Sequence, residues 1–224
     1  MRNLIWLLFA ITIFNSCKKA VNPDPVLPGK AHKVLILGNS ITYSAANPNI
    51  LWYGNWGMAA TSADKDYVHL LTARLKLAND STTVTIKTIS DFEVNFDTYD
   101  FDANLQTYRD TKPDILILRI GENVTRTQDA ALFERRYVDL LNYFKATNPE
   151  IKILAVGSVF RSRDLPNNVM SKYSAYISLT NLLNDNKNLA YDIFPNYEVS
   201  RHPSDKGMIL ISDQIWNALK AMIY

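Results

Sequence analysis

Short apolar segments alternate with helical patterns along most of this 224-residue chain. The segments that we predict as strands are rich in Val, Ile and Leu and lie at 33–37, 83–89, 114–120, 152–157 and 189–193. Residues with helical spacing occupy 64–78, 128–146 and 170–185, and a last helix begins near Asp205. Strands that alternate with helices favour a parallel sheet with helices on both faces. The pattern predicts an α/β fold, a three-layer α/β/α sandwich around a mostly parallel five-stranded sheet.

The N-terminal residues differ in character from the rest of the chain. Arg2 precedes an apolar stretch from Leu4 to Phe14, which has the length of a signal peptide and is short for a membrane span. Residues 18–31 contain three prolines, one glycine and few apolar groups, a composition typical of a tether. We therefore expect an export signal at 1–17, a flexible tether at 18–31 and one folded domain at 32–224.

Cys17 is the only cysteine, so the chain forms no intrachain disulfide. The segment Phe14-Asn15-Ser16-Cys17 resembles a bacterial lipobox, in which a small residue precedes the cysteine. The resemblance implies that Cys17 is the lipid attachment site of an exported bacterial lipoprotein, anchored to a membrane and periplasmic or on the cell surface. The alternative is an ordinary secretory peptide cut nearby, which leaves a free thiol.

The charge balance gives no reason to expect nucleic acid as a partner. The formal net charge of +2 falls to +1 when residues 1–16, whose only charge is Arg2, are removed, and no basic run occurs. The sequence also contains no cysteine pair, no His-x-x-x-His spacing and no glycine-rich phosphate loop. We therefore expect neither a metal nor another cofactor.

A serine follows the first predicted strand, at a position where open α/β sheets keep their active sites. Asn39 and Ser40 come after the glycine that ends this strand. A serine hydroxyl needs a base to remove its proton as it attacks a substrate. Of the three histidines, His32 precedes the first strand and His69 lies within a helical pattern, so His202 is the candidate base.

An asparagine follows the third predicted strand. Asn123 comes two residues after Gly121, whose missing side chain lets the backbone approach closely or take a positive φ. An enzyme of acyl transfer must place hydrogen-bond donors around the oxyanion of the tetrahedral intermediate. The side-chain amide of Asn123 and the backbone N–H of Ser40 are candidate donors. Turn formation is the alternative role for Asn123.

The chain resembles the SGNH (GDSL-type) hydrolases in three sequence blocks. In chain order, these are Gly38-Asn39-Ser40, Gly121-Glu122-Asn123 and His202-Pro203-Ser204-Asp205-Lys206-Gly207. The corresponding blocks of the family are G-D-S, G-x-N and D-x-x-H continued by P-x-x-x-G. The resemblance covers residues 33–223 and implies a flavodoxin-like SGNH fold. It further implies an esterase that cleaves carboxylic esters through an acyl-enzyme. Ser40 would be the nucleophile and His202 the base, with Asn123 and Gly121 in the catalytic site.

Two positions depart from the family pattern. The family takes a third oxyanion donor from a glycine after the second strand, where this chain has Ser90-Asp91-Phe92-Glu93. The D-x-x-H block would place an aspartate at position 199, where this chain has Val199. Glu198 could instead orient His202 as the acid of a triad. Alternatively, a backbone carbonyl could hold the ring in a serine–histidine dyad.

Aromatic residues and glycines gather after Ser40, in Trp52-Tyr53-Gly54-Asn55-Trp56-Gly57. They could line a sugar-binding surface or pack beneath the loop, and we assign Asn39, Trp56 and Gly57 to substrate binding. Together with export, this cluster predicts a small-molecule or glycan ester as substrate, such as O-acyl groups on carbohydrate. The alternative function is a non-catalytic glycan-binding lipoprotein on the same scaffold. The missing aspartate and glycine favour that alternative slightly, and the retained serine, asparagine and histidine argue against it.

Overall fold

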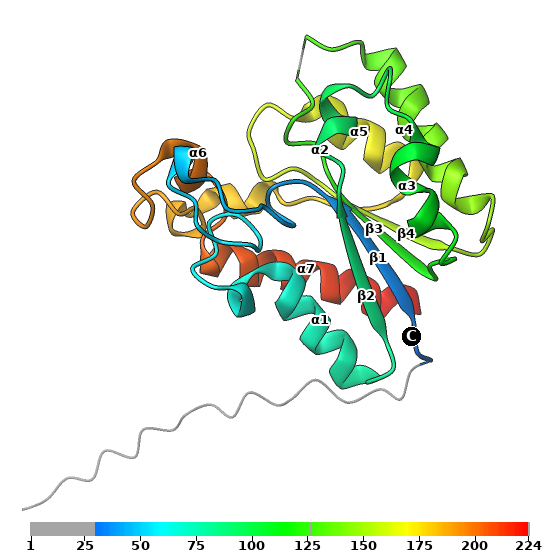
Figure 1. Cartoon of the computed structure of the whole chain (residues 1–224), viewed down its shortest axis with the longest axis horizontal. Coiled ribbons are helices and arrows are strands. Elements are labelled where there is room, and N and C mark those ends of the chain that lie inside the picture. The colour runs from blue at the N-terminus through cyan, green and yellow to red at the C-terminus, as the bar shows by residue number, and fades with distance from the viewer. Residues whose placement is uncertain (1–29, 126, 224) are drawn as a thin grey trace, which may run out of the picture.

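The computed structural model describes residues 30–125 and 127–223. Its centre is a five-stranded sheet in which every neighbouring pair is parallel, in the order β2-β1-β3-β4-β5. The strands are β1 (Lys33–Gly38), β2 (Thr83–Thr88), β3 (Ile115–Arg119), β4 (Lys152–Val156) and β5 (Ala175–Ile177). The predicted three-layer architecture is confirmed (Figure 1). The predicted signal peptide, Cys17 and nearly all of the tether lie outside the described residues.

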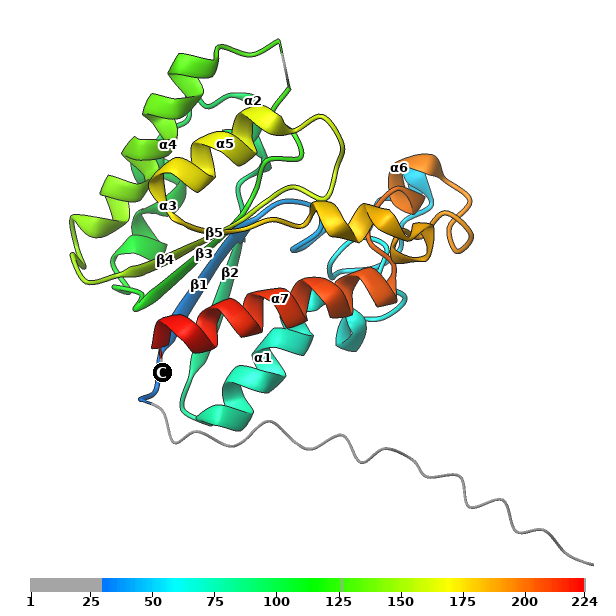
Figure 2. The same cartoon turned by 180° about the vertical axis from the view of Figure 1, so that it is seen from behind.

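Each face of the sheet carries its own layer of helices (Figures 1 and 2). One layer consists of α1 (Tyr67–Ala78) and α7 (Asp205–Ile223), and the other of α2 (Ser90–Val94), α3 (Phe101–Arg109), α4 (Ala130–Lys145) and α5 (Asp164–Tyr173). Val34 and Ile36 of β1 pack in the core beneath the first layer, whereas Leu35 and Leu37 pack beneath the second. This alternation follows from the two-residue period of a strand.

The burial of each strand explains how clearly the sequence predicts it. All residues of β3, and all but the first of β1 and β4, are buried, because helices cover both faces of these central strands. Such strands therefore have near-continuous apolar sequences. The strand β2 lies at an edge and is partly exposed, which agrees with the apolar–polar alternation of 83–89.

The fifth strand and the preceding helix differ from the prediction. The segment 189–193 is not a strand, and the helix predicted at 170–185 is interrupted by β5 and then by the 3-10 helix η3 (Thr180–Asn184). A strand of three residues at the sheet edge is too short to show a period of its own. Leu189 instead forms an antiparallel bridge with Pro203, and Ala190 N donates to the carbonyl of His202 at 3.0 Å. Leu189 and Ala190 thus hold the loop that carries His202, the candidate base.

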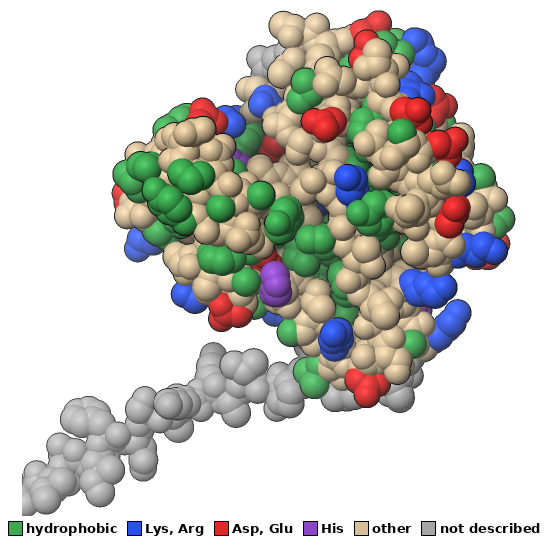
Figure 3. All heavy atoms as spheres, in the orientation of Figure 1, with side chains coloured by type: hydrophobic (Ala, Val, Ile, Leu, Met, Phe, Trp, Pro, Cys, Tyr) green, Lys and Arg blue, Asp and Glu red, His purple; other side chains and the backbone are tan. Residues whose placement is uncertain are grey.

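A lobe of short elements stands beyond the carboxyl ends of the strands (Figure 1). It contains the 3-10 helices η1 (Pro48–Ile50), η2 (Ala63–Lys65) and η4 (Asn186–Asn188) and the short helix α6 (Tyr197–Ser200). A separate small core fills the lobe and includes Trp52, Met58 and Val199. Figure 3 shows hydrophobic side chains gathered on the surface of this lobe. None of the described helices has the length and apolar character needed to cross a membrane.

Candidate active site

Ser40 lies in a tight turn that directly follows β1. The backbone N–H groups of Thr42 and Tyr43 donate to the Asn39 carbonyl at 2.9 and 3.0 Å, and Met58 N donates to the Ser40 carbonyl at 2.8 Å. Gly38 is required at the start of this turn, because a Cβ there would lie 1.8 Å from Thr42 Oγ1. The turn therefore holds Ser40 at the edge of the sheet where the strands end.

The structure brings His202 to this serine. Ser40 Oγ and His202 Nε2 lie 2.9 Å apart, although the two residues are 162 positions apart in the sequence. Backbone hydrogen bonds from His202 N to Val199 and from Ala190 N to His202, both 3.0 Å long, hold the loop. The Phe160 ring meets the imidazole edge to face, with 5.6 Å between centroids. His202 is thus buried and fixed in the position that a base for Ser40 needs.

The surroundings of His202 keep its ring neutral near neutral pH. Burial, assisted by the charge of Arg201, lowers the pKa of His202 to about 4. The charge of Glu122 and the backbone carbonyls of Glu198 and Val199 act in the opposite direction on this pKa. Among the described residues, Nδ1 has no hydrogen-bond partner. A neutral ring with its proton on Nδ1 leaves Nε2 free to accept the proton of the Ser40 hydroxyl.

The lowered pKa of His202 predicts the pH at which the activity declines on the acid side. Only the neutral ring accepts a proton, so kcat/KM for an ester should stay high as the pH falls through 6 and decline below about 4. An unperturbed histidine would place the decline near about 6.5. The measurement is the pH profile of kcat/KM on an uncharged ester, with the fold monitored by circular dichroism. A midpoint near pH 6.5 would contradict the buried, neutral ring described above.

Glu198, the candidate acid, does not contact the imidazole. Its carboxylate is 3.0 Å from Arg201 Nη2, and its side chain is 57% exposed. Its backbone carbonyl is the group that acts on the ring. In the described residues the arrangement is therefore a serine–histidine pair without a carboxylate on Nδ1.

Asn123 and Gly121 lie at the end of β3 and are held by a carboxylate that the sequence did not single out. Glu93, which α2 places beneath this turn, is fully buried. Its Oε2 accepts from Asn123 Nδ2 at 2.7 Å, and its Oε1 accepts from the backbone N–H of Gly121. Gly121 has φ +119°, which only glycine adopts readily. Glu93 thus orients the amide that is the candidate oxyanion donor.

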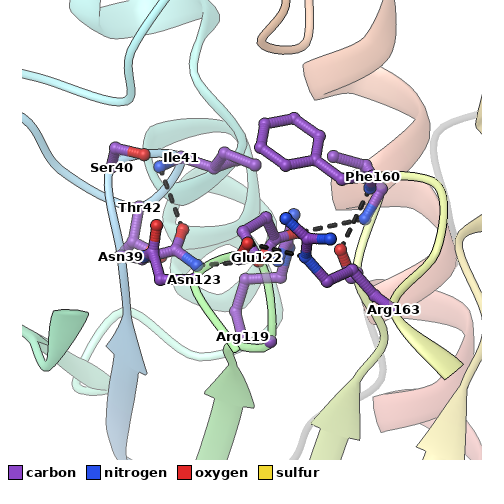
Figure 4. Close-up of polar contacts among 12 residues, drawn as sticks. Asn39, Ser40, Ile41, Thr42, Arg119, Glu122, Asn123, Phe160 and Arg163 are labelled. Atoms are coloured by element: carbon purple, nitrogen blue, oxygen red, sulfur yellow. Dashed lines mark hydrogen bonds and ion pairs between the residues drawn. The ribbon is translucent and has the colours of Figure 1, made fainter. Parts of the chain in front are cut away.

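A second buried carboxylate, Glu122, completes a network beneath the site (Figure 4). Glu122 Oε2 accepts from Arg119 Nη1 at 2.6 Å and from Asn39 Nδ2 at 2.7 Å. Asn39 Nδ2 also lies 3.3 Å from Glu93 Oε1. Although burial opposes it, the Arg119 guanidinium holds the pKa of Glu122 below its usual range. Burial and the charge of Glu122 raise the pKa of Glu93 to about 7.

The replacement Glu93→Gln tests the positioning role of this carboxylate. Glutamine keeps the size but places an NH₂ group where one of the two carboxylate oxygens accepts, so a donor on that side loses its acceptor. We expect kcat to fall about 10-fold to 100-fold with KM changed less than about twofold, because the loss acts on an oxyanion donor. The exposed substitution Glu150→Gln is the control. A change in KM with kcat unchanged, or no change in either, would contradict the positioning role of Glu93.

A small cavity with a volume of about 270 Å³ lies over Ser40, Asn123 and His202. We call it the serine cavity, and its lining consists of Ser40, Ile50, Met58, Asn123, Phe160, Glu198, Arg201 and His202. The segment 90–93 contributes no residue to this lining. Ile50, Met58 and Phe160 supply apolar walls that the sequence did not indicate.

The residues assigned to substrate binding lie outside the serine cavity. Asn39 is fully buried in the carboxylate network. Gly57 N donates to Asp66 Oδ2 at 2.9 Å, and Trp56 Nε1 donates to the Ala60 carbonyl at 2.8 Å. Trp56 also meets Trp52 edge to face at 5.7 Å. These contacts place the two tryptophans beneath the loop, in the small core of the lobe, whereas Tyr53 is exposed.

Comparisons with known proteins place this geometry in context. No protein-family model matches the sequence, and no curated protein matches it. Solved structures match most of the chain. A GDSL-like lipase from Parabacteroides merdae ATCC 43184 is 16% identical, with a TM-score of 0.59 over 86% of this chain and 97% of that one. The chain has the SGNH hydrolase fold.

Two esterases show the same SGNH hydrolase fold at similarly low identity. A two-domain esterase active on acetylated mannans is 17% identical, with a TM-score of 0.58 over 88% of this chain. The present chain spans about half of that protein, 52% of its length. A carbohydrate esterase of family 3 from Talaromyces cellulolyticus is 18% identical, with a TM-score of 0.53 over 86% of this chain and 98% of that one.

Proposed function

We propose that this protein is a serine ester hydrolase. The observation that carries the proposal is the 2.9 Å contact between Ser40 Oγ and His202 Nε2, in a cavity that Asn123 also lines. A neutral, buried imidazole beside a serine hydroxyl is the pairing that activates an oxygen nucleophile. The SGNH hydrolase fold, shared with solved esterases, supports the same reaction.

In the proposed reaction, Ser40 Oγ attacks the ester carbonyl while His202 Nε2 takes the hydroxyl proton. The backbone N–H of Ser40 and the amide of Asn123 donate to the oxyanion, each contributing about 2.7–4 kcal/mol. The intermediate collapses as His202 returns the proton to the departing alcohol, which leaves an acyl-enzyme. A water molecule then attacks the acyl-enzyme, again with His202 as base, and releases the acid and free Ser40.

We further propose that the ester is a small O-acyl group on a carbohydrate. The serine cavity, at about 270 Å³, suits a short acyl chain between the apolar walls of Ile50 and Met58. Several proteins of the same fold are carbohydrate or acetyl esterases, one of them crystallised with acetate and another with mannopentaose. Short acyl groups on sugars are therefore the substrates to test first.

The test combines turnover with covalent labelling. The protein should hydrolyse p-nitrophenyl acetate and release acetate from acetylated oligosaccharides. A serine-directed phosphonate should add one adduct, which tandem mass spectrometry should place on Ser40. Glycan binding without any turnover would favour the non-catalytic binding function instead. An adduct that persists undiminished in Ser40→Ala would assign the nucleophile elsewhere.

We also propose that the protein is exported and carries a lipid anchor at Cys17. Residues 1–29 lie outside the described part of the chain. The proposal is supported by the apolar stretch and the small residue before the only cysteine. Stable anchoring needs more than one acyl chain, so a multiply acylated cysteine is expected. In a bacterial host the wild type should incorporate labelled fatty acid and Cys17→Ala should not. Absence of label in the wild type would disprove the anchor.

A further inference from the structure

A second cavity adjoins the serine cavity and has a volume of about 260 Å³. We call it the arginine cavity, and its lining consists of Phe160, Arg161, Arg163, Leu183, Asn186, Leu189, Tyr191, Tyr197 and Arg201. Phe160 and Arg201 line both cavities and therefore form a shared wall. The two cavities therefore lie next to each other, on either side of these two side chains.

The arginine cavity concentrates positive charge, because three arginines and no acidic residue line it. Arg163 is fixed by its Nε, which donates to the Glu122 backbone carbonyl at 2.8 Å. Arg201 stacks over the Phe160 ring at 4.9 Å while pairing with Glu198. Arg161 is exposed, and no described carboxylate pairs with it. Guanidinium groups in such numbers match the paired anionic oxygens of a carboxylate or a sulfate.

Two tyrosines add a flat surface to this charge. The rings of Tyr191 and Tyr197 stack at 6.3 Å with an interplanar angle of 13°. Both rings remain exposed, at 43% and 64%. A tyrosine ring offers an apolar face together with a polar hydroxyl, a combination suited to a sugar ring, which also has apolar and polar sides. Positively charged side chains and an aromatic surface therefore lie together beside the serine cavity.

We propose that the arginine cavity is a subsite for an anionic sugar residue of the same glycan whose acyl group enters the serine cavity. This inference rests on the proposed esterase function and narrows its substrate to acidic glycans. The shared chemistry is a negatively charged oxygen group on a sugar ring, either a uronate carboxylate or a sulfate. The guanidinium groups would bind the anion, and Tyr191 and Tyr197 would support the ring.

The kinetic test uses three O-acetylated substrates of equal length: an oligogalacturonide, a sulfated galacto-oligosaccharide and a neutral galacto-oligosaccharide. We expect kcat/KM for at least one anionic substrate to exceed that for the neutral one about tenfold at low salt. The preference should shrink at about 0.5 M NaCl, where screening is strong. Arg161→Gln should reduce the preference about fivefold. Arg135→Gln, an exposed change on α4, is the matched control and should retain it.

A binding measurement separates this inference from the esterase proposal. Calorimetry with the two anionic oligosaccharides in unacetylated form needs no turnover, so it remains informative even if p-nitrophenyl acetate is not hydrolysed. We expect at least one of them to bind more tightly than the neutral oligosaccharide and to bind more weakly to Arg161→Gln. Equal binding of all three, or binding that Arg161→Gln leaves unchanged, would overturn the subsite. Loss of turnover alone would overturn only the esterase.

Discussion

Replacing Ser40 with alanine is expected to lower kcat for p-nitrophenyl acetate by at least about 10³-fold. The substitution removes the attacking oxygen, and the remaining oxyanion donors and binding contacts support only residual catalysis. A factor of 10³ corresponds to about 4 kcal/mol of activation free energy. The fold should persist, because the hydroxyl contacts His202 and is not part of the hydrophobic core. The measurement is the steady-state rate, together with the melting temperature.

Ser44→Ala is the matched control for this experiment. Ser44 lies on the same loop, and its hydroxyl contacts only the neighbouring Ala45 carbonyl, at 3.3 Å, among the described residues. Its loss should leave kcat within about twofold. If Ser40→Ala retained more than a tenth of the wild-type rate while Ser44→Ala behaved normally, Ser40 would not be the nucleophile.

Replacing Asn39 with aspartate should destabilise the protein strongly, even though it produces the G-D-S block of the SGNH hydrolases. Asn39 is fully buried, and its Nδ2 donates to both Glu93 and Glu122. An aspartate would remove the shared donor and place a third carboxylate beside the other two. The loss of one partner in a buried charged network costs about 3–5 kcal/mol. For a domain of this size, that is a fall of about 10 °C in melting temperature.

The effect of Asn39→Asp should depend on pH with a defined sign. Burial and the two neighbouring carboxylates would raise the pKa of the new aspartate in the folded protein above its unfolded value of about 3.9. The destabilisation by its charge is therefore absent below about pH 4 and grows as the pH rises. Urea unfolding at pH 4.5 and pH 8 measures it. Asn168→Asp, exposed on α5, is the control. Equal stability of Asn39→Asp and wild type at pH 8 would contradict the network.

The parts of the fold that the sequence predicts well are those whose periodicity is long and uninterrupted. The central strands β1, β3 and β4 are continuous apolar runs because they are buried on both faces. The helices α4 and α7 were predicted for the same reason, since each has a wide apolar face over many turns. The strand β5 could not be found this way, because three residues carry no detectable period.

The residues of the candidate site also differ in how well the sequence predicts them. Ser40, Asn123 and His202 stand at element ends and within recognisable blocks, so the sequence could single them out, and the structure places all three on one cavity. Glu93 could not be found, because it contacts Asn123 across 30 positions and belongs to a helix of five residues. Arg119 is the one sequence signal that points to the buried carboxylates. A charged residue inside the apolar run of β3, three positions before Glu122, indicates a buried ion pair.

The separation of Ser40 and His202 has a consequence for how the protein matures. Ser40 directly follows the first strand, but His202 belongs to a loop that is held by Leu189 and Ala190 and precedes α7. A chain still on the ribosome therefore contains the nucleophile long before its base. Under the proposed mechanism, hydrolysis can begin only after the segment that carries His202 has emerged and docked. Ester turnover would thus report completion of the entire domain, and a chain truncated before this loop would be inert toward esters during its synthesis.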